Sequence, residues 1–156
     1  MELHRTDVPL IDRTKIQAEV LVPLLKAMED EFGADRAREV ARRALADEFR
    51  QLARDWVEEA SGDRMAAFGR VAEHSTAENA IEFEPREAPP GEIRFDVTKC
   101  QYAQFFLEIG EPELGFLLVC GADGPIAEGL GIGFERHQTL MQGGSHCDFR
   151  YILAGE

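Results

Sequence analysis

The sequence has few basic residues for its size. Its 156 residues include 17 Lys and Arg against 30 Asp and Glu, which gives a formal net charge of −13. Nucleic-acid phosphates and anionic membrane surfaces attract basic patches, so this composition argues against either as the partner. The deficit is greatest after residue 80, where the only bases are Arg86, Arg94, Lys99, Arg136 and Arg150. These five side chains are therefore the candidates for holding an anionic substrate in that half of the chain.

Long apolar runs and paired cysteines are also missing. No stretch of about 18 consecutive apolar residues occurs, so we expect no membrane-spanning helix. Pro9, Asp12 and Arg13 interrupt the segment where the apolar core of a secretion signal would lie. The 3 cysteines are an odd number without a Cys-x-x-Cys pair, which does not suit a disulfide framework. We expect a cytoplasmic protein with reduced thiols and no cofactor.

The composition that is present suits one folded domain. Hydrophobic residues make up 44% of the chain and charged residues 30%, as in ordinary globular proteins. A chain of this length buries about two-thirds of its surface, and we treat residues 1–156 as a single domain. Residues 1–75 form its helical part, and residues 76–156 carry the motifs.

The helical part shows apolar residues at three- and four-residue steps, which is typical of amphipathic helices. Pro23 predicts a kink or a break in the first of these helices. Gly33 predicts the end of that helix, and Asp35 the N-cap of the next. The predicted helices cover residues 14–32, 37–57 and 64–71.

The second part mixes short strands, helices and glycine-rich turns. Alternating apolar residues predict strands over 80–83, 93–97, 134–141 and 147–153, the last two on either side of the Gly143-Gly144 turn. Helical spacing returns over 101–109, and Pro112 is well placed to open another helix that reaches Cys120. The predicted fold is α+β: an N-terminal helical layer packed on a small, mainly antiparallel C-terminal sheet with inserted helices.

The densest cluster of reactive side chains lies at residues 146–151. A nucleophilic cysteine needs a base or a cation that lowers the pKa of its thiol, and His146, Asp148 and Arg150 are adjacent to Cys147. In an extended strand, however, Cys147 and Tyr151 share one face while these three polar residues share the other.

Two further arrangements are open from the spacing alone. His137, on the preceding predicted strand, is an alternative base, and Arg136 could pair with Asp148 across the sheet. Both histidine rings and the thiol could converge only if the last strand begins after Cys147.

The cysteines also have interpretations other than a role as nucleophile. A cysteine next to phenylalanine is most often a small buried apolar residue. Cys100, Cys120, Cys147 and His146 match the ligand count of a tetrahedral zinc site, but their spacing is not diagnostic, so we expect no metal. Among the acidic residues, Asp123 is of interest because it follows Cys120 closely.

Several runs of the second part resemble the L-2-amino-thiazoline-4-carboxylic acid hydrolase family. They are Cys100–Phe106, Glu108–Gly115, Cys120–Asp123, Arg136–Gly143 and Cys147–Tyr151, all within about residues 95–153. The resemblance implies a hydrolase that opens the ring of a 2-amino-thiazoline-4-carboxylate to a carbamoyl-cysteine. Water adds to an amidine-like C=N carbon and a ring bond breaks, in our expectation a C–N bond.

Such a reaction requires an activated nucleophile, a proton donor and a cation for the substrate carboxylate. On the positions that match the family, the expected catalytic residues are Cys147, Asp148, His146 and His137. The expected substrate-binding residues are Arg136, Arg150, Gln138, Cys120, Asp123 and Tyr102. The alternative function is a non-catalytic small-molecule-binding or accessory domain of the same family, and the broad apolar helix faces leave room for a homodimer.

Overall fold

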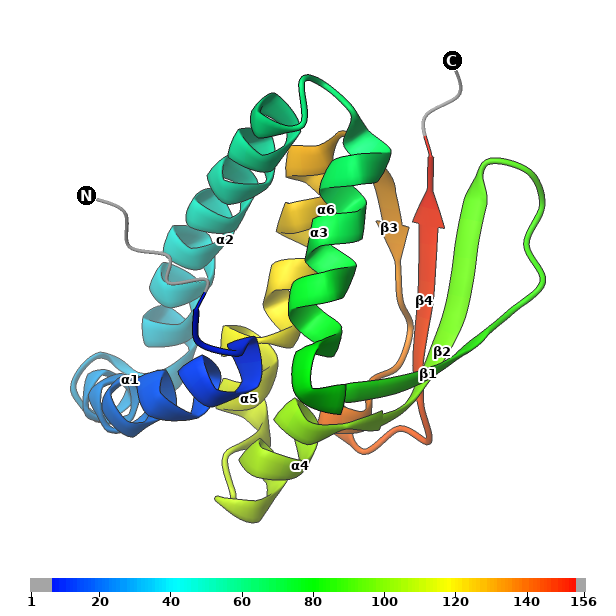
Figure 1. Cartoon of the computed structure of the whole chain (residues 1–156). Coiled ribbons are helices and arrows are strands. Elements are labelled where there is room, and N and C mark those ends of the chain that lie inside the picture. The colour runs from blue at the N-terminus through cyan, green and yellow to red at the C-terminus, as the bar shows by residue number, and fades with distance from the viewer. Residues whose placement is uncertain (1–6, 154–156) are drawn as a thin grey trace.

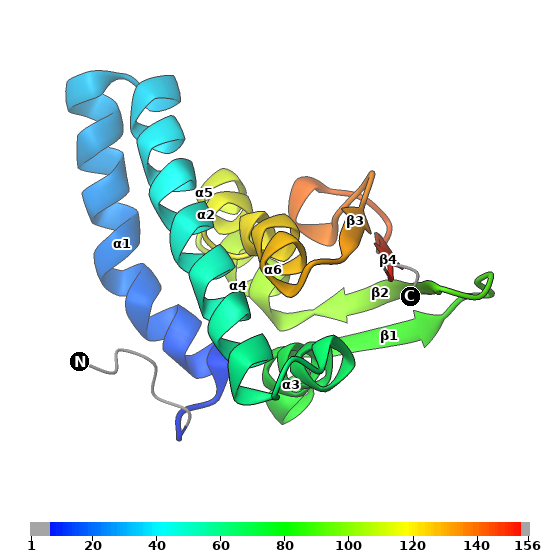
Figure 2. The ribbon, with the colours of Figure 1, turned by 90° about the horizontal axis from the view of Figure 1, so that it is seen from above.

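Three long helices form the N-terminal part of the computed structural model, which describes residues 7–153. They are α1 (Leu10–Phe32), α2 (Ala34–Glu59) and α3 (Arg64–Thr76). Figure 1 shows α3 running back from the end of α2, and Figure 2 shows α1 and α2 as a hairpin. All three cover the predicted segments and extend beyond them.

The ends of these helices correct two of the predictions. Helix α1 continues through Pro23 without a break, because this residue is exposed and water can bind the carbonyl that loses its partner. Gly33 ends α1 as predicted, with a φ of +85°, and its N–H donates to the carbonyl of Glu29. Asp35 is not the N-cap of α2, because α2 begins directly after Gly33 and places Asp35 in its first turn.

The sheet has four antiparallel strands in the order β1-β2-β4-β3. Their bounds are β1 Ile81–Pro85, β2 Glu92–Cys100, β3 Gly133–Glu135 and β4 Cys147–Ile152. The fold is therefore α+β, as the sequence predicts. Figure 2 shows the β1–β2 hairpin extending away from the helices.

The predicted strand over 134–141 is wrong after its first two residues. Beyond Glu135 the chain leaves the sheet and forms a single 3-10 turn, η3 (Leu140–Gln142). Two contacts hold this path: the carboxylate of Asp148 accepts the backbone N–H groups of His137 and Gln138, and the hydroxyl of Thr139 accepts the N–H of Gln142. These bonds replace the strand ladder.

The inserted helices lie between the α1–α2 hairpin and the sheet (Figure 2). They are α4 (Gln101–Glu108), α5 (Pro112–Leu118) and α6 (Asp123–Leu130), with the short turn η2 (Cys120–Ala122) before α6. The sequence predicted the first two but missed α6, whose glycines suggested turns. One of them, Gly129, packs against Ala53 of α2, whose side chain is fully buried.

The two faces of β4 have the alternation that the sequence predicts. Cys147 and Tyr151 are 6% exposed and face the helices, and Phe149 stacks on Phe95 of β2 with ring centroids 4.9 Å apart. Asp148 and Arg150 lie on the outer face. In the described residues, no helix is both long enough and apolar enough to cross a membrane.

Candidate functional site

A buried ion pair joins α6 to the segment after β3. The guanidinium of Arg136, whose side chain is 8% exposed, pairs with the carboxylate of Asp123 and donates to the carbonyl of Cys120 at 2.9 Å. It also lies 5.1 Å from the centre of the Phe149 ring and 5.3 Å from that of Phe134, which adds cation–π attraction. Arg136 therefore pairs with Asp123 and not, as one sequence alternative had it, with Asp148.

Three cysteines from distant parts of the chain lie around one apolar cluster of the core. Cys100 ends β2, Cys120 begins η2 and Cys147 begins β4. Burial raises the pKa of all three, and the charge of Asp123 raises each of them further. Cys100 and Cys120 pack against the cluster of Phe106 and Met141, and Cys147 is bonded to Leu140, which packs there as well. Burial likewise raises the pKa of Asp123, and the Arg136 guanidinium opposes that effect.

Each of two thiols accepts a backbone hydrogen bond. The Sγ of Cys100 is the N-cap acceptor of α4 and accepts the N–H of Ala103 at 3.4 Å. The Sγ of Cys147 accepts the N–H of Leu140 at 3.2 Å. These bonds stabilise thiolates and lower the pKa of both thiols, although burial outweighs them.

The histidines lie on the outer face of the sheet. The ring Nδ1 of His137 is 3.0 Å from Asp148 Oδ2, and this side chain is 80% exposed. The ring of His146 contacts Ser145 at 2.9 Å and Gln138 at 3.4 Å. Asp148 orders the loop through its bonds to backbone amides. The polar residues of the outer face thus form one group, and Cys147 points to the opposite face.

Two further sequence candidates have partners inside the fold. Arg150 donates to Glu92 and Glu135 at 2.5 Å each on the outer face. Tyr102 is 4% exposed and donates its hydroxyl to the carbonyl of Ser75 at 3.3 Å. In this structure both side chains connect secondary-structure elements.

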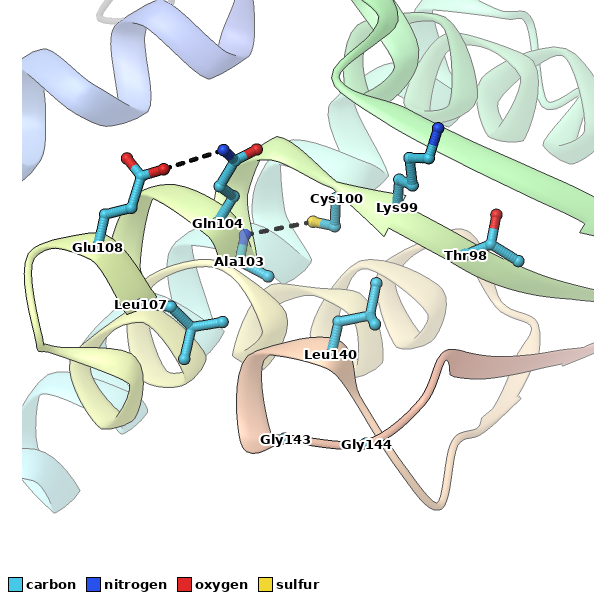
Figure 3. A pocket seen from close by; sticks show the side chains of 10 residues that line it. All are labelled: Thr98, Lys99, Cys100, Ala103, Gln104, Leu107, Glu108, Leu140, Gly143 and Gly144. Atoms are coloured by element: carbon cyan, nitrogen blue, oxygen red, sulfur yellow. Dashed lines mark hydrogen bonds between the residues drawn. The ribbon is translucent and has the colours of Figure 1, made fainter.

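An open groove of about 680 Å³ runs beside Cys100. Figure 3 shows the end of β2 and α4 on one side of it, and Leu140 with Gly143 and Gly144 on the other. Gln104 donates to Glu108 at 2.9 Å along its edge. The full lining is Thr98, Lys99, Cys100, Ala103, Gln104, Leu107, Glu108, Leu140, Gly143 and Gly144.

Most of this groove was not predicted from the sequence. Cys100 was considered there as a zinc ligand and as the start of a run that resembles the family, and Lys99 as one of the few bases. The available signal was the position of Cys100 directly before a predicted helix, where a thiol can cap the first N–H groups. Within residues 7–153, no group of three or more His, Cys, Asp or Glu side chains is arranged to hold a metal ion.

Fold and site together define the class of protein: an α+β fold with inserted helices, in which the guanidinium of an ion pair is buried against aromatic rings and three cysteines are partly or fully buried. A family model described as L-2-amino-thiazoline-4-carboxylic acid hydrolase matches residues 13–151. The chain belongs to this family. No curated protein was found to match the chain.

A solved structure of low sequence identity shares the fold, and a second one is similar to a lesser degree. The phenol-responsive sensory domain of the transcription activator PoxR, crystallised with phenol, is 16% identical, with a TM-score of 0.53; the match covers 85% of this chain and 72% of that one. A trafficking protein particle complex subunit 3 from Naegleria fowleri, covalently bound to palmitic acid, is 14% identical, with a TM-score of 0.46 and coverage of 90% and 97%. The first likeness supports the fold alone.

Proposed function

We propose that this protein is a hydrolase that opens a C–N bond in a small cyclic amidine carboxylate bound in the groove beside Cys100. Two findings together carry the proposal. The chain belongs to a family named for this kind of hydrolase, and Cys100, which begins a run of residues that resembles the family, lines this groove together with Leu140, whose N–H bonds to the thiol of Cys147.

The proposal assigns the nucleophile to Cys100, where the sequence favoured Cys147. Cys100 lines the groove and is partly exposed, whereas Cys147 is 6% exposed. The Cys100 thiol also caps α4, and the N-terminus of a helix stabilises a thiolate through its free N–H groups and its dipole. Cys147 does not line the groove, but its thiol accepts the N–H of Leu140, which does.

Groups for both ends of the substrate lie along the groove. Lys99 is the base that lines it, and its side chain is 72% exposed and pairs with Glu82 in an exposed contact of 3.0 Å. Such a surface pair is weak, so a substrate carboxylate can replace Glu82. The carboxylate of Glu108 suits the N–H groups of an amidine, because charge-assisted hydrogen bonds of this kind are strong.

The chemistry proceeds in two steps. The Cys100 sulfur attacks the amidine carbon as its thiol proton passes to the ring nitrogen, and the ring C–N bond breaks to release that nitrogen as an amine. Water then attacks the same carbon and expels the thiolate, which leaves a carbamoyl group on the substrate sulfur. One water is consumed and the thiol is regenerated, so the sum is a hydrolysis.

The first experiment is to incubate the purified protein with 2-amino-thiazoline-4-carboxylate and to identify the product by mass and by its new functional group. Breaking the C–N bond releases an amine, whereas breaking the C–S bond releases a thiol. We expect amine without thiol. A protein that generates neither product contradicts the proposed activity.

Variants then test the site. We expect Cys100→Ser to remove turnover and Lys99→Met to raise KM with a smaller effect on kcat, because Lys99 binds substrate without reacting. Arg86→Met, which removes an exposed surface base outside the groove, is the matched control and should retain both kcat and KM. Full activity in Cys100→Ser would show that Cys100 is not the nucleophile. Cys147 would then be the candidate, and Cys147→Ser tests it directly.

A second candidate function is a small-molecule-binding domain without catalysis. It is favoured by the raised pKa of all three thiols, which keeps them protonated at neutral pH in the free protein. The PoxR domain, which shares this fold, is described as phenol-responsive. Calorimetry with the same thiazoline separates the two: binding without product formation supports the second function.

A further inference from the structure

The outer face of α1 carries an apolar stripe exposed to solvent. Ile16, Val20 and Leu24 are 61%, 67% and 52% exposed, and Pro23 and Ala27 on the same side are also exposed. Figure 2 places α1 at the border of the molecule away from the sheet, so this face points outward. Single exposed apolar residues are ordinary, but five on one helix face form a contiguous patch.

The spacing of the stripe suits a second helix. Residues 16, 20, 23 and 27 follow one another at steps of 4, 3 and 4, the spacing with which one helix packs along another in a coiled-coil manner. The buried side of α1, represented by Ile11, Ala18 and Leu25, is already packed in the core. The helix thus has two apolar faces, and only one of them has a partner in the described chain.

We propose that a second copy of this chain docks on this face, with the two α1 helices antiparallel about a two-fold axis near residue 22. The charges beside the stripe favour a copy over another partner. Glu19 and Lys26 lie along the same border of the stripe, about equally far from residue 22. An antiparallel copy places Glu19 beside Lys26 of the partner subunit, and the symmetry makes this pair twice.

A second pair of charges has the same spacing along the helix. Lys15 and Asp30 are also about equally distant from residue 22 and opposite in sign. The order of charges along α1 is therefore complementary to its own reverse, which is the property that an isologous interface requires. Lys26 also bonds Glu111 within its own chain while its side chain remains 53% exposed, and an ammonium has three donors.

The size of the face sets the strength of the dimer. A stable interface buries about 800 Å² on each partner. A helix of 23 residues is about 35 Å long and 10 Å wide, so one face supplies roughly half of that area. The dimer is therefore a weak one, with a dissociation constant in the range of about 1 to 100 μM.

Sedimentation velocity of the full chain over a range of concentrations tests the proposal. We expect a monomer–dimer equilibrium, and Val20→Glu should weaken it about a hundredfold, because each interface then buries two unpaired carboxylates. Met65→Glu is the matched control: Met65 is 47% exposed on α3, so the same charge there should leave the equilibrium unchanged.

Charge reversal tests the antiparallel register. Glu19→Lys should weaken the dimer about tenfold, and the double variant with Lys26→Glu should restore it. A monomer at all concentrations up to about 1 mM, or a dimer that survives Val20→Glu, overturns the proposal. A dimer that forms only after residues 1–6 are removed also overturns it, because that segment would then be the occupant of this face.

Discussion

Gly129 is the residue at which α6 comes closest to α2. A Cβ added there would lie 2.5 Å from the carbonyl oxygen of Arg50 and 2.6 Å from the Cβ of Ala53. These atoms belong to the α2 backbone or are fixed to it, so rotation of a side chain cannot relieve the overlap. Gly129→Ala must therefore move α6 away from α2, across a contact in which Ala53 is fully buried.

The magnitude follows from two opposing effects. Alanine is favoured over glycine inside a helix by about 0.5–1 kcal/mol. Overpacking of a filled core costs about 1–3 kcal/mol, and contacts about 1 Å inside the normal separation lie toward the upper end. We expect Gly129→Ala to lower the free energy of unfolding by about 2 kcal/mol, which is about 4–8 °C in Tm for a domain of this size.

The same substitution on α3 is the control. A Cβ at Gly69 would have nothing within 4 Å, so Gly69→Ala keeps only the helix preference and should raise the free energy of unfolding by about 0.5–1 kcal/mol. Urea unfolding can be followed by the fluorescence of Trp56, the only tryptophan in the chain. If Gly129→Ala is as stable as Gly69→Ala, the close approach of α6 to α2 is not as described.

Three more predictions concern charge and thiol chemistry. A hydrogen bond from Arg150 lowers the pKa of Glu92 to about 2. The contribution of Glu92 to stability is therefore complete above the ordinary carboxyl pKa of about 4.3 and is lost as the pH falls toward 2. Glu92→Gln should flatten the dependence of Tm on pH in that interval. Arg136→Met leaves the carboxylate of Asp123 without its buried partner and should lower the free energy of unfolding by about 3 kcal/mol, while adding Asp123→Asn should recover part of the loss in the same urea assay. Burial raises the pKa of Cys100, Cys120 and Cys147, so alkylation by iodoacetamide followed by mass spectrometry should be slow at pH 7, accelerate with alkaline pH and reach Cys100 first; rapid labelling of Cys147 at neutral pH would contradict this picture.

The sequence predicts the helical layer and β4 well because their patterns are local. Apolar steps of three and four residues define α1 and α2, and alternation assigns the two faces of β4. Helix α6 was missed because Gly124, Gly129 and Gly131 are equally typical of turns. At Gly129 the small residue is required by the approach of another helix, and that information is not present in the surrounding sequence.

The candidate site is less accessible to sequence reasoning for the same reason. The pairing of Arg136 with Asp123 bridges 13 positions, and the convergence of Cys100 and Cys147 depends on how β2, η3 and β4 pack. Neighbours in sequence were also misleading: His146 and Asp148 are adjacent to Cys147, yet the pleat of the strand turns them to the opposite face. The groove became visible only when α4 and the Gly143-Gly144 turn were placed together.

The two faces of strand β4 belong to different parts of the structure. Its odd positions, Cys147, Phe149 and Tyr151, belong to the interior, and its even positions, Asp148 and Arg150, belong to the surface network. Substitutions in one set leave the other in place, so the composition of either face can drift separately. The insertion of one residue within β4, directly after Cys147, would turn over the residues that follow and bring a carboxylate and a guanidinium against the aromatic interior. The number of residues in this segment is therefore constrained more strictly than their identity.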